Sequence, residues 1–163
     1  MGEGTAGAID MGRLHAVLAR ADIGDLLARF AHCLDERDFT GYADLFTADG
    51  VLRMPGAEHR GRAGLAEFVA ADLGRYHRTH HLITNTQVDV DGDTASSRSC
   101  LYAVHLRSAG DPADWWSVGG HYAHTYRREG GRWRIRTVDI TPIWLGEGAR
   151  PDPGPGPGRE RPR

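Results

Sequence analysis

Three side chains of this sequence have the chemical types that proton transfer requires. Asp35 follows an apolar stretch that ends at Leu34, whereas His81 and His105 lie far downstream on segments in which polar and apolar residues alternate. A carboxylate that holds one imidazole, beside a second imidazole that titrates near neutrality, is sufficient for general acid–base chemistry. We therefore predict that Asp35, His81 and His105 form a catalytic group, provided that the fold brings them together.

Each of these residues also has a purely structural interpretation. Asp35 could end a helix and pair with Arg37, because a carboxylate at a helix C-terminus needs a compensating partner. His81 could be a buried core histidine, and the period of two along a strand turns the adjacent His80 to the other face. His105 could be a surface histidine at the end of its strand.

Composition limits the class of protein. The chain has 163 residues, of which 40% are apolar and 26% charged, as expected for one globular domain. A net charge of −2 gives no general attraction to nucleic acid or to an anionic membrane. No apolar run reaches the length of a membrane span, and the first residues lack the features of a signal peptide, so a cytoplasmic location is expected.

The residues that are missing or rare narrow the chemistry further. All twenty basic residues are arginine, which excludes a lysine Schiff base or a lysine general base. Cys33 and Cys100 are the two cysteines, and we expect two partly buried thiols rather than a disulfide framework. Neither an HxH or HExxH motif nor a phosphate-binding glycine loop occurs, so we expect no metal and no cofactor.

The first half of the chain is predicted to be mainly helical. From about residue 11 to residue 73, apolar residues recur at steps of three and four. We expect a first helix begun by Asp22, with an apolar stripe formed by Ile23, Leu26, Leu27, Phe30, Ala31 and Leu34. A short second helix is expected to begin at Asp38 and Thr40 and to carry Tyr42, Leu45 and Phe46. A strand over residues 50–54 and a third helix over residues 64–73, which Gly74 ends, are expected to follow.

After Gly74 the apolar period becomes two, which predicts strands. The alternation slips between Ile83 and Val88 and again between Ile135 and Val138, and each slip predicts a β-bulge that bends the sheet. The expected strands cover residues 77–90, 95–106, 115–128 and 132–145, with glycine-containing turns at 91–93 and 129–131 and a longer loop at 108–112.

Helices followed by consecutive antiparallel strands predict an α+β fold. We expect a cone-shaped single domain over residues 11–148, with three N-terminal helices packed on a curved, mainly antiparallel sheet that encloses a pocket. Residues 1–10 are expected to be a flexible N-terminus, and residues 149–163, rich in Pro, Gly and Arg, a disordered tail.

Several segments resemble the SnoaL-like polyketide cyclases and the cone-shaped fold of nuclear transport factor two. The resemblance covers about residues 14 to 146 and is fairly specific for the fold, which hosts many unrelated activities. The segments that carry it are LDERDF at 34–39 with LFTADG at 45–50, HHLITN at 80–85 with VDVDGDTA at 88–95, and GHY at 120–122 with GRWRI at 131–135.

Within this superfamily the catalytic pattern is closest to scytalone dehydratase. That family's catalytic aspartate falls on Asp35 and its two catalytic histidines fall on His81 and His105. Other positions depart from the pattern: Leu34 and Met54 replace two tyrosines that hold a carbonyl-polarising water, and Gly120 and Tyr122 replace a serine and an asparagine. The resemblance therefore implies a similar proton transfer on a different substrate.

The implied activity is that of a cofactor-independent dehydratase, a lyase that acts on a β-hydroxy carbonyl such as an aromatic polyketide-like intermediate of secondary metabolism. In this interpretation Asp35 holds His105 as the base, and His81 delivers a proton to the departing hydroxyl. The expected substrate-binding residues are Phe30, Tyr42, Met54, Phe68, Trp116 and Tyr122 as pocket walls, with Asn85 and Tyr102 as hydrogen-bonding residues.

Two alternatives remain open from the sequence. The same residues would serve a SnoaL-like aldol cyclase or a ketone isomerase, with Asp35 as the base. The chain could also be a non-catalytic module that binds a small molecule or dimerises, with Trp133, Arg134 and Trp144 at the interface. A homodimer or higher homo-oligomer is expected in either case, and the expected ligand is a small hydrophobic or aromatic molecule.

Overall fold

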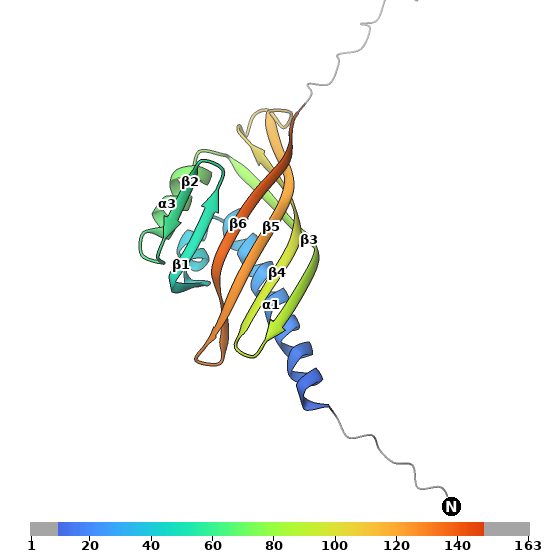
Figure 1. Cartoon of the computed structure of the whole chain (residues 1–163). Helices are drawn as coiled ribbons and strands as arrows, with labels where there is room; N and C mark the ends of the chain where they lie inside the picture. The colour runs from blue at the N-terminus through green and yellow to red at the C-terminus, as the bar shows by residue number, and fades with distance from the viewer. Residues whose placement is uncertain (1–9, 149–163) are drawn as a thin grey trace, which may run out of the picture.

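Three helices pack on a six-stranded sheet in the computed structural model, which describes residues 10–148 (Figure 1). The expectations for residues 1–9 and 149–163 lie outside this range. Among the described residues, no helix is both long and apolar enough to cross a membrane. The elements are α1 (Met11–Asp35), α2 (Phe39–Asp44), β1 (Phe46–Met54), β2 (Ala57–Arg60), α3 (Leu65–Leu73), β3 (Arg78–Asp91), β4 (Thr94–Leu106), β5 (Trp115–Glu129) and β6 (Arg132–Glu147).

Helix α1 begins earlier than its apolar pattern indicates. The side chain of Asp10 accepts a hydrogen bond from the Arg13 backbone N–H at 3.1 Å and caps the helix, so the prediction that Asp22 begins it is wrong. The first turns project beyond the sheet, and their apolar side chains, including Leu18, are exposed (Figure 1). The predicted stripe is confirmed further along, where Ile23, Leu26, Leu27, Phe30 and Leu34 are buried.

The two shorter helices follow the sequence signals closely. Asp38 caps α2 by accepting a hydrogen bond from the Gly41 N–H at 2.8 Å. The helix ends at Asp44, so Phe46 begins β1 instead of belonging to the helix as expected. Helix α3 ends where Gly74 was expected to end it.

The sheet has the strand order β2-β1-β6-β5-β4-β3. Strand β1 is parallel to β6, and all other neighbours are antiparallel. Helix α1 runs along one face of this curved sheet, and α3 lies beside β1 and β2 (Figure 1). The α+β cone with a mainly antiparallel sheet is therefore confirmed, and strand β2 is an addition that the sequence analysis did not predict.

Both predicted bulges are present. The register between β3 and β4 shifts between Thr84 and Gln87, where Asn85 has a φ of 52°. The register between β5 and β6 shifts after Thr125: Thr125 pairs with Thr137, and the next residue of β5 pairs with Ile135. A third shift, next to Gly119, had no counterpart in the predicted pattern. An extra residue on one strand bends it and increases its twist, so these shifts curve the sheet around its inner face.

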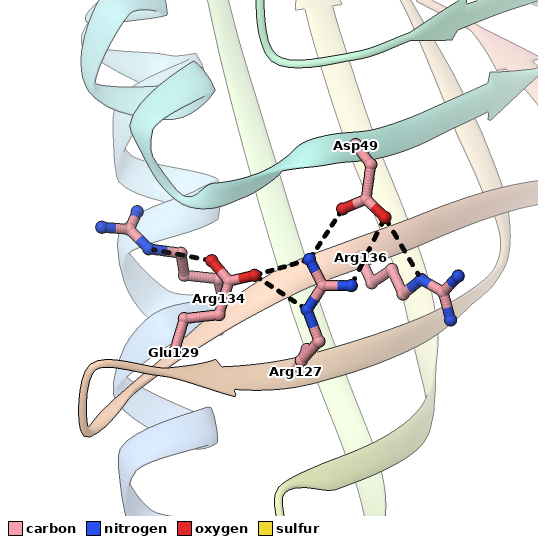
Figure 2. Close-up of polar contacts among 5 residues, drawn as sticks. All are labelled: Asp49, Arg127, Glu129, Arg134 and Arg136. Atoms are coloured by element: carbon pink, nitrogen blue, oxygen red, sulfur yellow. Dashed lines mark hydrogen bonds and ion pairs between the residues drawn. The ribbon is translucent and has the colours of Figure 1, made fainter.

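An ion-pair network joins the first strand to the last hairpin (Figure 2). Asp49 on β1 accepts from the Arg127 guanidinium at 2.9 Å and lies 3.9 Å from the Arg136 Nε, while Glu129 pairs with Arg127 and lies 3.9 Å from the Arg134 Nε. These side chains are partly exposed, so the network contributes little to the free energy of unfolding.

Candidate active site

The carboxylate of Asp35 lies at the C-terminus of α1 and binds the adjacent edge strand β3. Its Oδ1 is 2.7 Å from the His81 Nδ1 and 2.9 Å from the Thr79 hydroxyl, and its Oδ2 accepts from the His81 backbone N–H at 2.9 Å. These contacts are the compensating partners that a carboxylate at a helix C-terminus needs. The buried stripe that ends at Leu34 presses α1 onto the sheet and brings Asp35 to β3.

The hydrogen bonds define the charge of Asp35 and the tautomer of His81. Burial alone would raise the pKa of Asp35, but the His81 ring, the His81 backbone N–H and the Thr79 hydroxyl outweigh it and hold the pKa below its usual value. An ionised carboxylate can only accept, so the His81 Nδ1 must carry the proton that points at Asp35. The opposite ring nitrogen, Nε2, is then free to accept a proton.

His105 faces His81 across the inner side of the sheet. The two rings meet edge to face with centroids 5.6 Å apart, and the His105 ring stacks on Trp116 at 4.1 Å. Burial, with smaller contributions from the neighbouring His81 and Arg75, lowers the pKa of His105 to about 4, although Asp35 and the Trp116 backbone partly oppose this shift. His105 is therefore neutral at physiological pH, and its buried Nδ1 has no hydrogen-bond partner among residues 10–148.

The structure brings Asp35, His81 and His105 together but corrects their pairing. Asp35 binds His81, so the prediction that it holds His105 is wrong. The reason is the strand order: β3 is the edge strand next to α1, and β4, which carries His105, lies one strand further away. His80 is exposed on the opposite face of β3, as its position in the alternation requires.

A cavity of about 510 Å³ opens beside the two histidines. Its wall is mostly apolar and includes both histidines, whereas Asp35 borders a separate groove that His81 also lines. Leu34 and Met54, which stand where the resemblance places tyrosines, are on the cavity wall. Of the expected substrate-binding residues, Phe30, Tyr42, Met54, Trp116 and Tyr122 line this cavity.

Three of the expected pocket residues lie elsewhere. Phe68 turns toward His59, with ring centroids 5.1 Å apart. Asn85 is exposed on the β3 bulge, where its side-chain amide points at the Cys100 sulfur. Tyr102 is 40% exposed on the outer face of the sheet and packs against Trp144.

The remaining sequence expectations have mixed outcomes. Cys33 and Cys100 are free, partly buried thiols, as predicted. Trp133 is only 7% exposed and belongs to the core, so it does not form an interface surface, whereas Trp144 is exposed.

Two polar residues of the site were missed. Thr79 lies two residues before His81, on the same face of β3, and the alternation could have identified it. Asp72 on α3 is on the cavity wall and pairs with Arg75 at 2.8 Å. No feature of the sequence separates Asp72 from other polar helix residues.

Comparison with known proteins identifies the family. The SnoaL-like domain family matches residues 15–139, and the chain belongs to this family. The uncharacterized protein Rv2910c of Mycobacterium tuberculosis is 30% identical over 118 residues, which are 71% of this chain and 80% of that protein.

Solved structures agree on the nuclear transport factor two-like fold. A putative scytalone dehydratase from Novosphingobium aromaticivorans superposes with a TM-score of 0.73 at 20% identity, over 90% of this chain and 97% of that one. A hexachlorocyclohexane dehydrochlorinase (LinA, type 2) superposes with a TM-score of 0.76 at 21% identity, over 84% and 93% of the two chains. At these identities the likeness establishes the fold.

Proposed function

We propose that this protein is a cofactor-independent lyase that dehydrates a β-hydroxy carbonyl compound, with His81 as the base. The observation that carries the proposal is the 2.7 Å contact between the Asp35 carboxylate and His81, whose side chain forms part of a mostly apolar cavity wall. Structural neighbours of this fold include a putative scytalone dehydratase and a dehydrochlorinase, and both names denote eliminations.

The first step is removal of the proton next to the carbonyl group. The unprotonated Nε2 of His81 takes this proton, the C–H electrons move into the carbonyl group, and an enolate forms. His81 becomes an imidazolium whose Nδ1–H remains directed at Asp35. The carboxylate stabilises this cation and fixes the ring orientation, so Asp35 acts through His81 as a positioning residue.

The second step expels the hydroxyl group. The enolate electrons return to form the C=C bond, the C–O bond breaks, and the leaving oxygen takes the proton from the His81 Nε2–H and departs as water. His81 is then restored for the next cycle. His105 is neutral, because its pKa is held near 4, and its role is to hold the leaving hydroxyl by a hydrogen bond rather than to supply a proton.

The cavity wall favours a small aromatic or polyketide-like substrate. The volume of about 510 Å³ suits a ligand of one or two rings, and the aromatic side chains offer faces for ring packing. The expected homodimer and the cytoplasmic location stay predictions.

The aldol cyclase or ketone isomerase remains the second candidate, because it shares the first step. The geometry argues against Asp35 as its direct base: both carboxylate oxygens already accept hydrogen bonds, and Asp35 is not on the cavity wall. In this alternative, too, His81 would remove the proton.

Product analysis separates the candidates. The protein is incubated with a panel of hydroxylated aromatic ketones, and products are examined by mass spectrometry. Loss of 18 mass units identifies a dehydratase, and an unchanged mass with a new retention time identifies a cyclase or an isomerase. A binding module would give neither product, and its affinity for a ligand of the panel would be unchanged in the His81→Gln variant.

A further inference from the structure

Two buried tyrosines of the cavity have hydroxyl groups that the protein leaves without a partner. Tyr42 and Tyr122 are each only 2% exposed, and both line the cavity. Among residues 10–148, no group forms a hydrogen bond with either hydroxyl. Some unpartnered polar atoms of these residues have no accessible surface, but the two tyrosine oxygens do not belong to them. Both oxygens therefore retain accessible surface, and it faces the cavity that the two residues line.

The two rings are held in place by the same neighbour. Phe30 of α1 packs against Tyr42 with centroids 4.9 Å apart and meets Tyr122 nearly edge to face at 5.7 Å. Tyr42 also packs against Phe46 at 5.2 Å. The rings thus have little freedom to move, and their hydroxyl groups are fixed in direction before any ligand arrives.

One cavity wall joins the tyrosines to the histidines. On β5, Trp116, Val118 and Tyr122 line the cavity, and the Trp116 ring stacks on His105. His81 and Tyr42 line the same cavity from other elements. A ligand that touches His81 can therefore also reach the tyrosines.

The protonation state of the pair suits hydrogen-bond donation. Burial raises the pKa of Tyr42 well above its usual value, and Tyr122 raises it further. Burial also raises the pKa of Tyr122, with a contribution from the negative charge of Asp35. Both side chains stay protonated in neutral and mildly alkaline solution and keep an O–H to donate.

Unpartnered buried hydroxyls weaken a fold unless something binds them. We propose that the Tyr42 and Tyr122 hydroxyls together bind the carbonyl oxygen of the substrate and stabilise the enolate oxygen that forms when His81 removes the proton. This inference rests on the proposed function and deepens it. It specifies a conjugated or aryl carbonyl compound whose oxygen lies at the two tyrosine hydroxyls and whose leaving group lies near His105.

The test replaces each hydroxyl by hydrogen and keeps the ring. Tyr42→Phe and Tyr122→Phe are compared with Tyr126→Phe, a matched control whose hydroxyl lies outside the cavity and bonds to Ser97 at 2.7 Å. The probe is 4-nitrophenol, titrated at a pH where it is ionised, because its phenolate oxygen resembles an enolate oxygen. Binding is followed by the absorption change of the probe.

We expect the wild type and Tyr126→Phe to bind the probe alike and each cavity variant to bind it at least tenfold more weakly. With a turnover substrate, each cavity variant should lose about 10²–10³-fold in kcat with little change in KM. Because the lost hydroxyls have no protein partner, the melting temperature should be unchanged or higher, which separates this role from a structural one.

Equal probe binding by the wild type and both cavity variants would overturn the inference, as would a wild type that does not bind the probe. If one variant fails to fold, the other still decides. The proposed function is tested separately by His81→Gln, which should abolish turnover and still bind the probe. If His81→Gln loses turnover but Tyr42→Phe and Tyr122→Phe keep wild-type turnover and probe binding, only the role of the tyrosine pair is contradicted. If His81→Gln keeps full turnover, the proposed function is contradicted.

Discussion

Replacement of Asp35 by asparagine removes one charge from the site and keeps its shape. The carbonyl oxygen of the new side chain could still accept one hydrogen bond from β3, but its amide nitrogen would be a donor facing the His81 Nδ1. His81 would then adopt the tautomer with the proton on Nε2, which cannot accept a proton from a substrate. The imidazolium that forms during the reaction would also lose its counter-charge.

The size of the effect follows from the distance between the two groups. At 2.7 Å, with an effective dielectric constant of about 20, the attraction between imidazolium and carboxylate is about 6 kcal/mol, and partial solvent exposure of Asp35 reduces it to about 4–5 kcal/mol. This corresponds to a loss of roughly 10³–10⁴-fold in kcat/KM. Glu36→Gln removes the same charge from the next, exposed residue and should stay within about twofold of the wild type.

Two measurements check the Asp35→Asn prediction. Steady-state kinetics give the loss of kcat/KM, and nitrogen NMR of the imidazole rings reports which nitrogen of His81 carries the proton. We expect Nδ1 to be protonated in the wild type and Nε2 in the variant. A variant that keeps more than a tenth of the activity would show that the Asp35 charge does not support His81, as would a loss of activity with the wild-type His81 tautomer.

The remaining predictions concern the histidines. His81→Gln should reduce turnover by at least about 10³-fold. His80→Gln, on the exposed face of the same strand, should leave kcat/KM unchanged. Similar losses in both variants would contradict the assignment of His81 as the base. His105→Gln should reduce kcat by about 10–100-fold, and an unchanged kcat would remove His105 from the mechanism. Burial lowers the pKa of His105 to about 4 and of His124 to about 3, below the usual value near 6.5, so the unfolded chain binds these protons first. The free energy of unfolding should therefore be highest above about pH 6.5 and fall between pH 6.5 and 4 by about 1.4 kcal/mol per pH unit for each histidine. In chemical denaturation at pH 7.5 and pH 5, His124→Leu should reduce the decrease in the free energy of unfolding between these pH values. An unchanged decrease in this variant would contradict the burial of His124 as a neutral ring.

The long strands were predictable because their two faces meet different surroundings. Alternation along β3 to β6 located these strands within about two residues, and its slips located two bulges. Strand β2 escaped prediction because Ala57–Arg60 contains no alternating apolar residues and depends on pairing with β1. The early start of α1 escaped because its first turns have no core to face.

The residues of the site could be chosen from the sequence, but their pairing could not. The choice between His81 and His105 as the partner of Asp35 depends on which strand lies at the edge next to α1, and this is a property of the tertiary structure. Tyr102 was a different error, because it alternates with buried Leu101 and Ala103 and its outward direction could have been deduced.

Phe68 was misplaced for another reason. An α-helix presents several faces, and its apolar period does not specify whether a residue faces the cavity or a neighbouring loop. The packing of Phe68 against His59, a residue of β2, was hidden together with that strand.

Hydrogen–deuterium exchange at the carbon next to a ketone is the sharpest test of His81 as the base, because it reports proton removal without any leaving group. Aryl ketones that lack a β-hydroxyl are incubated with the protein in D₂O, and loss of the α-proton signal is followed by NMR. We expect exchange above the buffer rate with the wild type and with His80→Gln, and none above that rate with His81→Gln. Exchange that persists at the wild-type rate in His81→Gln would show that His81 is not the base.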